Sequence, residues 1–288
     1  MVLEKNVDLP RMRTDMKVRI AILDLYEGLA NEGMRCIREI INQWGEGNNF
    51  DVELHEFDVR LQQELPDLSY DVYISSGGPG SPLESEGLEW DNKYCQWIKQ
   101  LEKWNNDVAN YPKKHAFFIC HSFQLACRYY KIANVCKRKS TSFGVFPVHL
   151  MQDGMNESVF EGLRNPFYAV DSRDYQVIEP DHNRIKEIGG AILAIEKERP
   201  HVPYERAIMA ARFNDYFIGS QFHPEADAIG MSMYLQRDDK KKTVIENHGE
   251  DKWRSMIEQL NDPRKIMFTY SHVLPNFLNT AVGELVES

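Results

Sequence analysis

The sequence lacks any apolar run long enough to cross a bilayer, and residues 1–16 (MVLEKNVDLPRMRTDM) contain no apolar core of the kind found in signal peptides. Its five cysteines form no paired Cys-x-x-Cys pattern, which disfavours a structural zinc site, and their odd number fits free thiols in a reducing compartment. A formal net charge of -10 disfavours non-specific binding to nucleic acid. We therefore expect a cytoplasmic protein that binds neither membrane nor nucleic acid.

Hydrophobic periodicity indicates an α/β fold. Apolar residues alternate at 18–22, 50–54 and 70–74, and a stretch with helical spacing separates the first two segments. Strand, helix and strand in this order predict a right-handed crossover and a parallel sheet. We also expect a helix at 89–108, a strand at 115–119 and a helix after it. The pattern then changes to short strands, expected at 143–150, 167–170, 191–195, 207–213 and 216–222.

One domain is expected over residues 17–288, with a loose polar arm at 1–16 and a helical extension from about residue 227. The final apolar segment, 267–281, is expected to pack on the sheet. The basic run at 137–139 is typical of a solvated loop, and we give it no function.

The loop Ser75-Ser76-Gly77-Gly78-Pro79-Gly80-Ser81-Pro82 directly follows the third expected strand. It is neither a P-loop, since no Lys-Ser or Lys-Thr follows the glycines, nor a dinucleotide-binding Gly-x-Gly-x-x-Gly loop. Two interpretations remain open: a tight turn, or a backbone that offers N–H groups to an anion at the carboxyl end of a strand.

Cys120 lies where an apolar strand changes into a helix, as a nucleophile on a sharp turn would. A buried, inert thiol is the commoner reading of a lone cysteine. His223 ends another predicted strand, and parallel strands end at the same edge of a sheet. Glu225, two residues further on, points the same way in an extended segment and can hold the imidazole. The pattern therefore favours a thiol activated by a histidine base.

A thiolate that attacks a carbonyl creates an oxyanion, which N–H donors must stabilise. The backbone N–H of His121, directly after the cysteine, can supply one donor at the start of the following helix. Gly78 can supply the second, because glycine allows the backbone to approach closely.

These motifs together resemble the class I (triad-type) glutamine amidotransferases. That family carries a Gly-Gly-Pro or Asn-Gly-Pro loop, a Gly-φ-Cys-x-Gly-x-Gln elbow (φ apolar) and a late His-Pro-Glu, in this order, and the resemblance spans roughly residues 17–226. It implies that Cys120 is the nucleophile, His223 the general base and acid, and Glu225 its orienting carboxylate. Gly78 and His121 match the oxyanion-hole positions. The substrate-binding positions are matched by Gln124 and, more loosely, by the segment Ser172, Arg173, Asp174 and Tyr175.

Three residues depart from the family pattern. Phe118 and Ser122 replace the glycines on either side of the nucleophile, and Arg173 stands where many relatives carry histidine. Arg173 is expected either to pair with a carboxylate near the pocket or to be a surface residue. These departures leave Cys120, His223 and Glu225 in place. They concern which substrate the protein uses and whether it is active.

The resemblance implies a flavodoxin-like, three-layer α/β/α sandwich with a mainly parallel sheet, and hydrolysis of a γ-glutamyl amide, foremost that of glutamine, through a thioester. This reaction needs a small-molecule substrate but no metal or cofactor. The residues after Glu225 are too few for a second, ammonia-accepting domain, so the acceptor is either a partner protein or absent. Two alternatives stay open: a hydrolase of another γ-glutamyl compound, and a non-catalytic partner protein that retains the fold.

Overall fold

The computed structural model describes residues 16–29, 31–199, 205–260, 262 and 265–286. The arm expected at 1–16 therefore lies, except for Met16, outside the described residues. In the first half of the fold each strand is followed by a helix, except that β2 leads directly to β3: β1 (Lys17–Asp24), α1 (Glu32–Asn48), β2 (Asp51–Asp58), β3 (Val72–Ser75), α2 (Glu89–Asn106), β4 (His115–Ile119) and α3 (His121–Tyr130). The second half is richer in strands: β5 (Asn134–Leu150), α4 (Gln152–Met155), η1 (Ser158–Phe160), β6 (Phe167–Ile178), α5 (His182–Glu187), β7 (Ala191–Glu196), β8 (Ile208–Arg212) and β9 (Phe217–Ser220).

The described part of the chain builds one nine-stranded sheet in the order β2-β1-β3-β4-β9-β8-β7-β5-β6. Strands β2, β1, β3, β4 and β9 are parallel to one another. From β9 to β6 every neighbouring pair is antiparallel. The expectation of a mainly parallel sheet was therefore wrong, because the sheet is mixed. The short turn at 213–216 joins β8 to β9, and a connection of that length can only return the chain antiparallel to itself.

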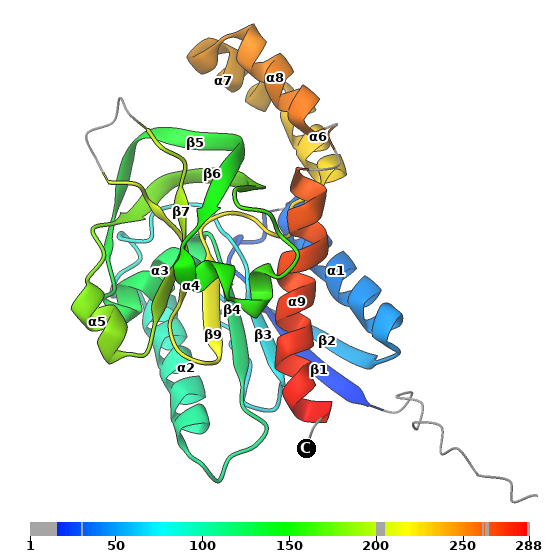
Figure 1. Cartoon of the computed structure of the whole chain (residues 1–288), viewed down its shortest axis with the longest axis vertical. Coiled ribbons are helices and arrows are strands. Elements are labelled where there is room, and N and C mark those ends of the chain that lie inside the picture. The colour runs from blue at the N-terminus through cyan, green and yellow to red at the C-terminus, as the bar shows by residue number, and fades with distance from the viewer. Residues whose placement is uncertain (1–15, 30, 200–204, 261, 263–264, 287–288) are drawn as a thin grey trace, which may run out of the picture.

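Helices cover both faces of the parallel half, which gives three layers (Figure 1). The β1 side chains alternate between two cores: Ile20 and Ile22 face α1, whereas Ala21 and Leu23 face α2 and α3. All four are fully buried, as expected of a strand with helices on both sides.

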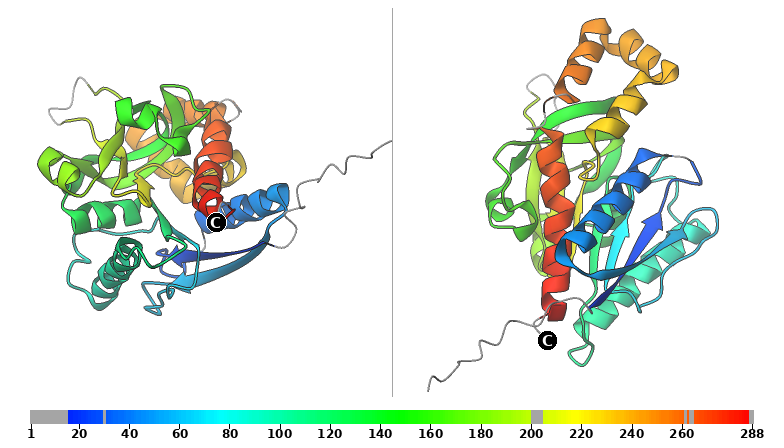
Figure 2. Two further views of the ribbon diagram at one scale, coloured as in Figure 1. Left: turned by 60° about the horizontal axis from the view of Figure 1, so that its bottom comes forward. Right: turned by 90° about the vertical axis from the view of Figure 1, so that its right-hand side faces the viewer.

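Four helices follow the last strand: α6 (Ala228–Gln236), α7 (Asp238–His248), α8 (Glu250–Leu260) and α9 (Ile266–Val286). Helices α6–α8 project beyond one end of the sheet, whereas α9 runs back beside α1 (Figures 1 and 2). The Phe277 ring lies 5.2 Å from the ring of Phe117 in β4. The expectation that the final apolar segment packs on the sheet is confirmed. No helix in the described ranges is both long and apolar enough to span a membrane.

Strands β5 and β6 are longer than expected. The basic run 137–139 lies within β5 rather than in a loop. Lys137 and Lys139 are exposed, whereas the Arg138 side chain is only 7% exposed and pairs with Glu196 at 3.3 Å. Strand β6 continues to Ile178, so residues 172–175 lie within a strand rather than after one.

Candidate active site

Cys120 forms a sharp turn between β4 and α3. Its backbone has φ 49° and ψ −97°, a conformation that residues other than glycine rarely adopt. Two hydrogen bonds hold this conformation, from the Cys120 N–H to the Ser220 carbonyl at 2.7 Å and from the Gln124 N–H to the Cys120 carbonyl at 3.0 Å. The elbow predicted from the sequence is present, and it holds Cys120 at the carboxyl end of β4.

Ser122 ties the elbow to the neighbouring strand. Its hydroxyl oxygen accepts from the Ile119 N–H at 2.8 Å and lies 2.8 Å from the Ser75 carbonyl, to which the hydroxyl donates. The side chain is fully buried. A serine in place of the family's glycine therefore fits this turn and adds bonds to it.

Phe118 points away from Cys120 into the core beneath α2 and α3. Its ring contacts those of Trp97, Phe213 and Phe217, with centroids 5.9–6.4 Å apart. Gly219, its partner on β9, makes room for this side chain, since a methyl group there would lie 3.0 Å from the Phe118 Cβ and 2.7 Å from its carbonyl oxygen. The bulky residue is thus accommodated on the far side of the sheet from the thiol.

His223 reaches the elbow because β9 runs parallel to β4, with Ser220 opposite Ile119. The His223 N–H donates to the Val170 carbonyl at 2.9 Å, which fixes the backbone just beyond the strand end. The ring Nδ1 lies 2.8 Å from Oε1 of Glu225, whose side chain is 1% exposed. The orienting contact expected between residues i and i+2 is present.

The environment of His223 favours its charged form. Burial alone would lower the pKa of the imidazole, but the charges of Glu225 and the Cys120 thiolate and their hydrogen bonds outweigh burial. The pKa of His223 is consequently raised well above its ordinary value of 6.5. The Cys120 sulfur is among the groups that raise this pKa, through its charge and a hydrogen bond.

Two backbone N–H groups, just beyond the carboxyl ends of β3 and β4, lack a hydrogen-bond partner in the described part of the chain. His121 is the first residue of α3, so its N–H has no acceptor within the helix. Within the described chain, neither this N–H nor that of Gly78 donates a hydrogen bond. Gly78 is confined by Leu25, whose carbonyl oxygen would lie 2.5 Å from a methyl group at residue 78.

The His121 side chain is not an acid–base group at neutral pH. Burial, helped by the charges of Arg60 and Arg128, lowers the pKa of its imidazole to about 3.

Gln124 is buried and donates from Nε2 to Oε1 of Gln221 at 3.0 Å. Gln221 in turn places its own Nε2 3.7 Å from the Cys120 sulfur. The sequence interpretation missed Gln221. Its signal was available in the sequence, because Gln221 lies two residues before His223, as Glu225 lies two residues after it, in a segment expected to be extended.

The segment 172–175 contributes backbone rather than charge. The Ser172 carbonyl oxygen lies 3.7 Å from the Cys120 sulfur. Arg173 faces the other way, with 1% of its side chain exposed, and pairs with Asp171 at 2.8 Å and Glu196 at 3.2 Å. It is therefore not a surface residue, and its charge is already matched inside the protein. Asp174 is exposed and accepts from Thr141, while Tyr175 is partly buried.

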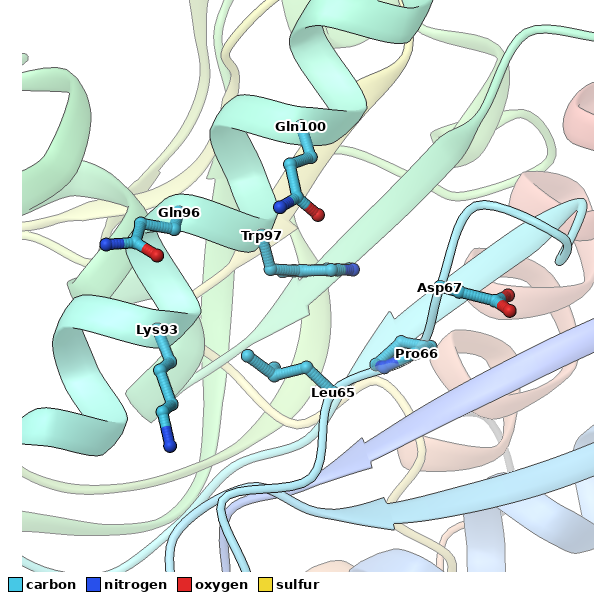
Figure 3. Close-up of a pocket in the computed structure, with 7 residues that line it drawn as sticks. All are labelled: Leu65, Pro66, Asp67, Lys93, Gln96, Trp97 and Gln100. Carbon is cyan, nitrogen blue, oxygen red and sulfur yellow. The ribbon is translucent and has the colours of Figure 1, made fainter.

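A separate hollow of about 300 Å³ opens between α2 and the connection from β2 to β3 (Figure 3). Its lining comes from Leu65, Pro66, Asp67, Lys93, Gln96, Trp97 and Gln100. None of the predicted site residues lines it. Across the described ranges, no group of three or more His, Cys, Asp or Glu side chains is arranged to hold a metal ion.

Known structures share this fold. A glutamine amidotransferase from Thermotoga maritima superimposes with a TM-score of 0.64 at 17% identity, covering 92% of this chain and 98% of its own. A glutamine amido transferase from Methylobacillus flagellatus gives 0.59 at 14% identity, covering 91% and 94%. The glutaminase domain of Trypanosoma brucei CTPS, solved with bound acivicin, gives 0.56 at 16% identity, covering 92% and 94%.

No curated protein matches the sequence. The sequence model of the family described as glutamine amidotransferase class-I, however, matches residues 31–238. That match covers well over half of the chain and contains the glycine loop, the cysteine elbow and the His-Pro-Glu segment. The chain therefore belongs to the class-I glutamine amidotransferase family.

Proposed function

We propose that this protein hydrolyses the γ-amide of glutamine through a γ-glutamyl thioester on Cys120 and releases ammonia. The observation that carries the proposal is the meeting of the strained Cys120 elbow with the Glu225-held imidazole of His223. A buried structural thiol would need neither a positive φ nor a charged histidine beside it.

In the first half-reaction the Cys120 thiolate attacks the γ-carbonyl carbon, and a C–S bond forms. The N–H groups of Gly78 and His121 bind the oxyanion. The amide C–N bond then breaks as the His223 imidazolium gives its proton to the leaving nitrogen, which departs as ammonia. Glu225 holds the ring throughout through Nδ1.

In the second half-reaction water attacks the thioester carbonyl. The now neutral His223 ring takes a proton from this water as the C–O bond forms, and the C–S bond breaks to release glutamate and the Cys120 thiolate. The same two N–H groups stabilise the second oxyanion.

The ammonia acceptor is proposed to be either a partner protein or absent. Beyond Glu225 the described chain forms four helices, and α9 among them is occupied in packing on the sheet. The idea of a non-catalytic protein loses its main support, because Phe118 points away from the thiol and leaves the elbow intact.

The test measures ammonia release from glutamine and from γ-glutamyl amines with the wild type and with Cys120→Ala. We expect activity with glutamine that disappears in Cys120→Ala. Cys127→Ala is the matched control, since Cys127 is a fully buried thiol in α3, the helix that follows Cys120. Activity that survives in Cys120→Ala refutes the mechanism. A preference for a γ-glutamyl amine over glutamine would reassign the substrate. If the wild type releases ammonia from none of the substrates, the non-catalytic alternative is supported.

A further inference from the structure

Tyr26 lies beside the candidate site, although the motifs do not include it. It follows β1, at the same edge of the sheet as the elbow, because β1 and β4 both run parallel to β3. Its N–H donates to Oδ1 of Asp24 at 2.7 Å, and its carbonyl accepts from the Leu29 N–H at 3.0 Å. These bonds fix the backbone of Tyr26 and so determine where its side chain begins.

Two glycines show where the Tyr26 hydroxyl lies. A methyl group at Gly77 would come 2.9 Å from the hydroxyl oxygen and 3.0 Å from Cε1 of His223. A methyl group at Gly33 would come 2.7 Å from the same oxygen and 3.3 Å from Oε1 of Glu225. The hydroxyl therefore flanks the His223–Glu225 pair, on the Cε1 edge of the ring. Any side chain at residue 33 or 77 would displace it.

In the part of the chain that the structure describes, the Tyr26 hydroxyl has no hydrogen-bond partner. Within the described ranges it makes no hydrogen bond to protein, although buried or half-buried tyrosine hydroxyls usually find one. Burial raises the pKa of the phenol, and the charges of Glu225 and then Cys120 raise it further. The group is thus a neutral O–H at neutral pH, able both to donate and to accept.

We propose that the Tyr26 hydroxyl orients the hydrolytic water of the second half-reaction beside His223. This inference rests on the proposed function. The water donates one hydrogen to the neutral His223 ring and the other to the Tyr26 oxygen, which leaves an oxygen lone pair directed at the thioester carbonyl. Attack transfers the first proton to His223, forms the C–O bond and expels the Cys120 thiolate. Tyr26 keeps its own proton throughout, so it acts by positioning the nucleophile.

The assignment predicts a specific kinetic pattern. Formation of the thioester releases ammonia and needs no water, whereas its decay does. Tyr26→Phe removes only the hydroxyl and keeps the ring between the two glycines. We expect thioester decay to slow by on the order of tenfold, the factor that corresponds to one neutral hydrogen bond. Ammonia should then appear as a burst equal to the enzyme concentration, followed by slow turnover.

The experiment combines rapid-quench ammonia measurement with mass spectrometry of Cys120 and adds hydroxylamine as a second nucleophile. Hydroxylamine attacks a thioester without needing a positioned water, so it should restore turnover of Tyr26→Phe and yield γ-glutamyl hydroxamate. Tyr70→Phe is the control, because it removes a hydroxyl that lies 3.0 Å from Nδ1 of His55, at the opposite end of β3.

The outcomes separate the two proposals. A burst with hydroxylamine rescue in Tyr26→Phe, absent in Tyr70→Phe, supports the water-orienting role. Wild-type kinetics in Tyr26→Phe, or slower thioester formation without rescue, overturns that role and leaves the proposed function standing. A wild-type protein that forms no thioester with glutamine or γ-glutamyl amines overturns both.

Discussion

Replacement of Gly78 by alanine should separate the oxyanion donor from the nucleophile. The added methyl group would lie 2.5 Å from the Leu25 carbonyl oxygen and 3.1 Å from the Leu25 Cβ. Ordinary contacts begin at 3.4 Å, so the loop or the Leu25 backbone must move by about 0.9 Å. A displacement of about 1 Å at a reacting centre costs on the order of 100-fold, and loss of one oxyanion donor costs about 100- to 1000-fold.

We therefore expect kcat for glutamine hydrolysis to fall by roughly 100- to 1000-fold in Gly78→Ala. Alkylation of Cys120 by iodoacetamide passes through no oxyanion and should proceed at close to the wild-type rate. Gly47→Ala is the matched control, because nothing lies within 4 Å of a methyl group at that position in α1. It should keep full activity and raise the free energy of unfolding by about 0.5–1 kcal/mol.

Two results would refute this reasoning. Near wild-type turnover in Gly78→Ala would show that its N–H does not stabilise the transition state. An equal loss of turnover and of alkylation would show that the substitution disturbs the thiolate itself, and Gly78 would then be a packing residue rather than a donor.

Three further predictions concern the elbow and its base. Ser122→Gly should retain glutamine hydrolysis but lower the free energy of unfolding, measured by urea denaturation, by about 1–3 kcal/mol, because two buried hydrogen bonds are lost. Unchanged stability would contradict the role given to the Ser122 hydroxyl. Phe118→Ala should lower the free energy of unfolding by about 3–5 kcal/mol in the same assay, because the aromatic contacts of the ring are lost. Increased glutamine hydrolysis in a stably folded variant would show instead that the Phe118 ring obstructs the site. The raised pKa of His223 predicts a stabilising contribution that is complete below about pH 6.5 and is lost as the pH rises through the higher folded-state pKa. Glu225→Gln should move that loss to lower pH in denaturation curves recorded between about pH 6 and pH 10, and an unmoved curve would exclude Glu225 as the cause.

The meeting of Cys120 with His223 was predictable because it needs only two local signals and one rule. Each residue ends a strand, and parallel strands end at one edge of a sheet. The family motifs and the i, i+2 relation of Glu225 to His223 then supplied the rest of the site.

The mixed character of the sheet was harder to predict. Side chains alternate between the two faces with a period of two residues in parallel and antiparallel strands alike. The alternation in the second half of the sequence therefore predicts strands but not their directions. The short connection at 213–216 was the one local sign of the reversal.

Buried charge was the hardest feature to predict from a single sequence. Arg138 lies in a basic run whose sequence is typical of a solvated segment. The fold places Glu196, 58 residues later in the chain, in contact with the Arg138 side chain. Arg173 depends in the same way on Glu196 and Asp171. Tyr26 was missed because its position depends on the path of a loop and on two glycines from different segments, which no periodicity encodes.

The parallel pairing of β4 with β9 has a consequence for the chain while it is being made. Cys120 leaves the ribosome about a hundred residues before His223, an interval on the order of 5–20 s at common rates of synthesis. On the proposed mechanism, the thiol gains its histidine base only when β9 pairs with β4, so its activation coincides with closure of the sheet.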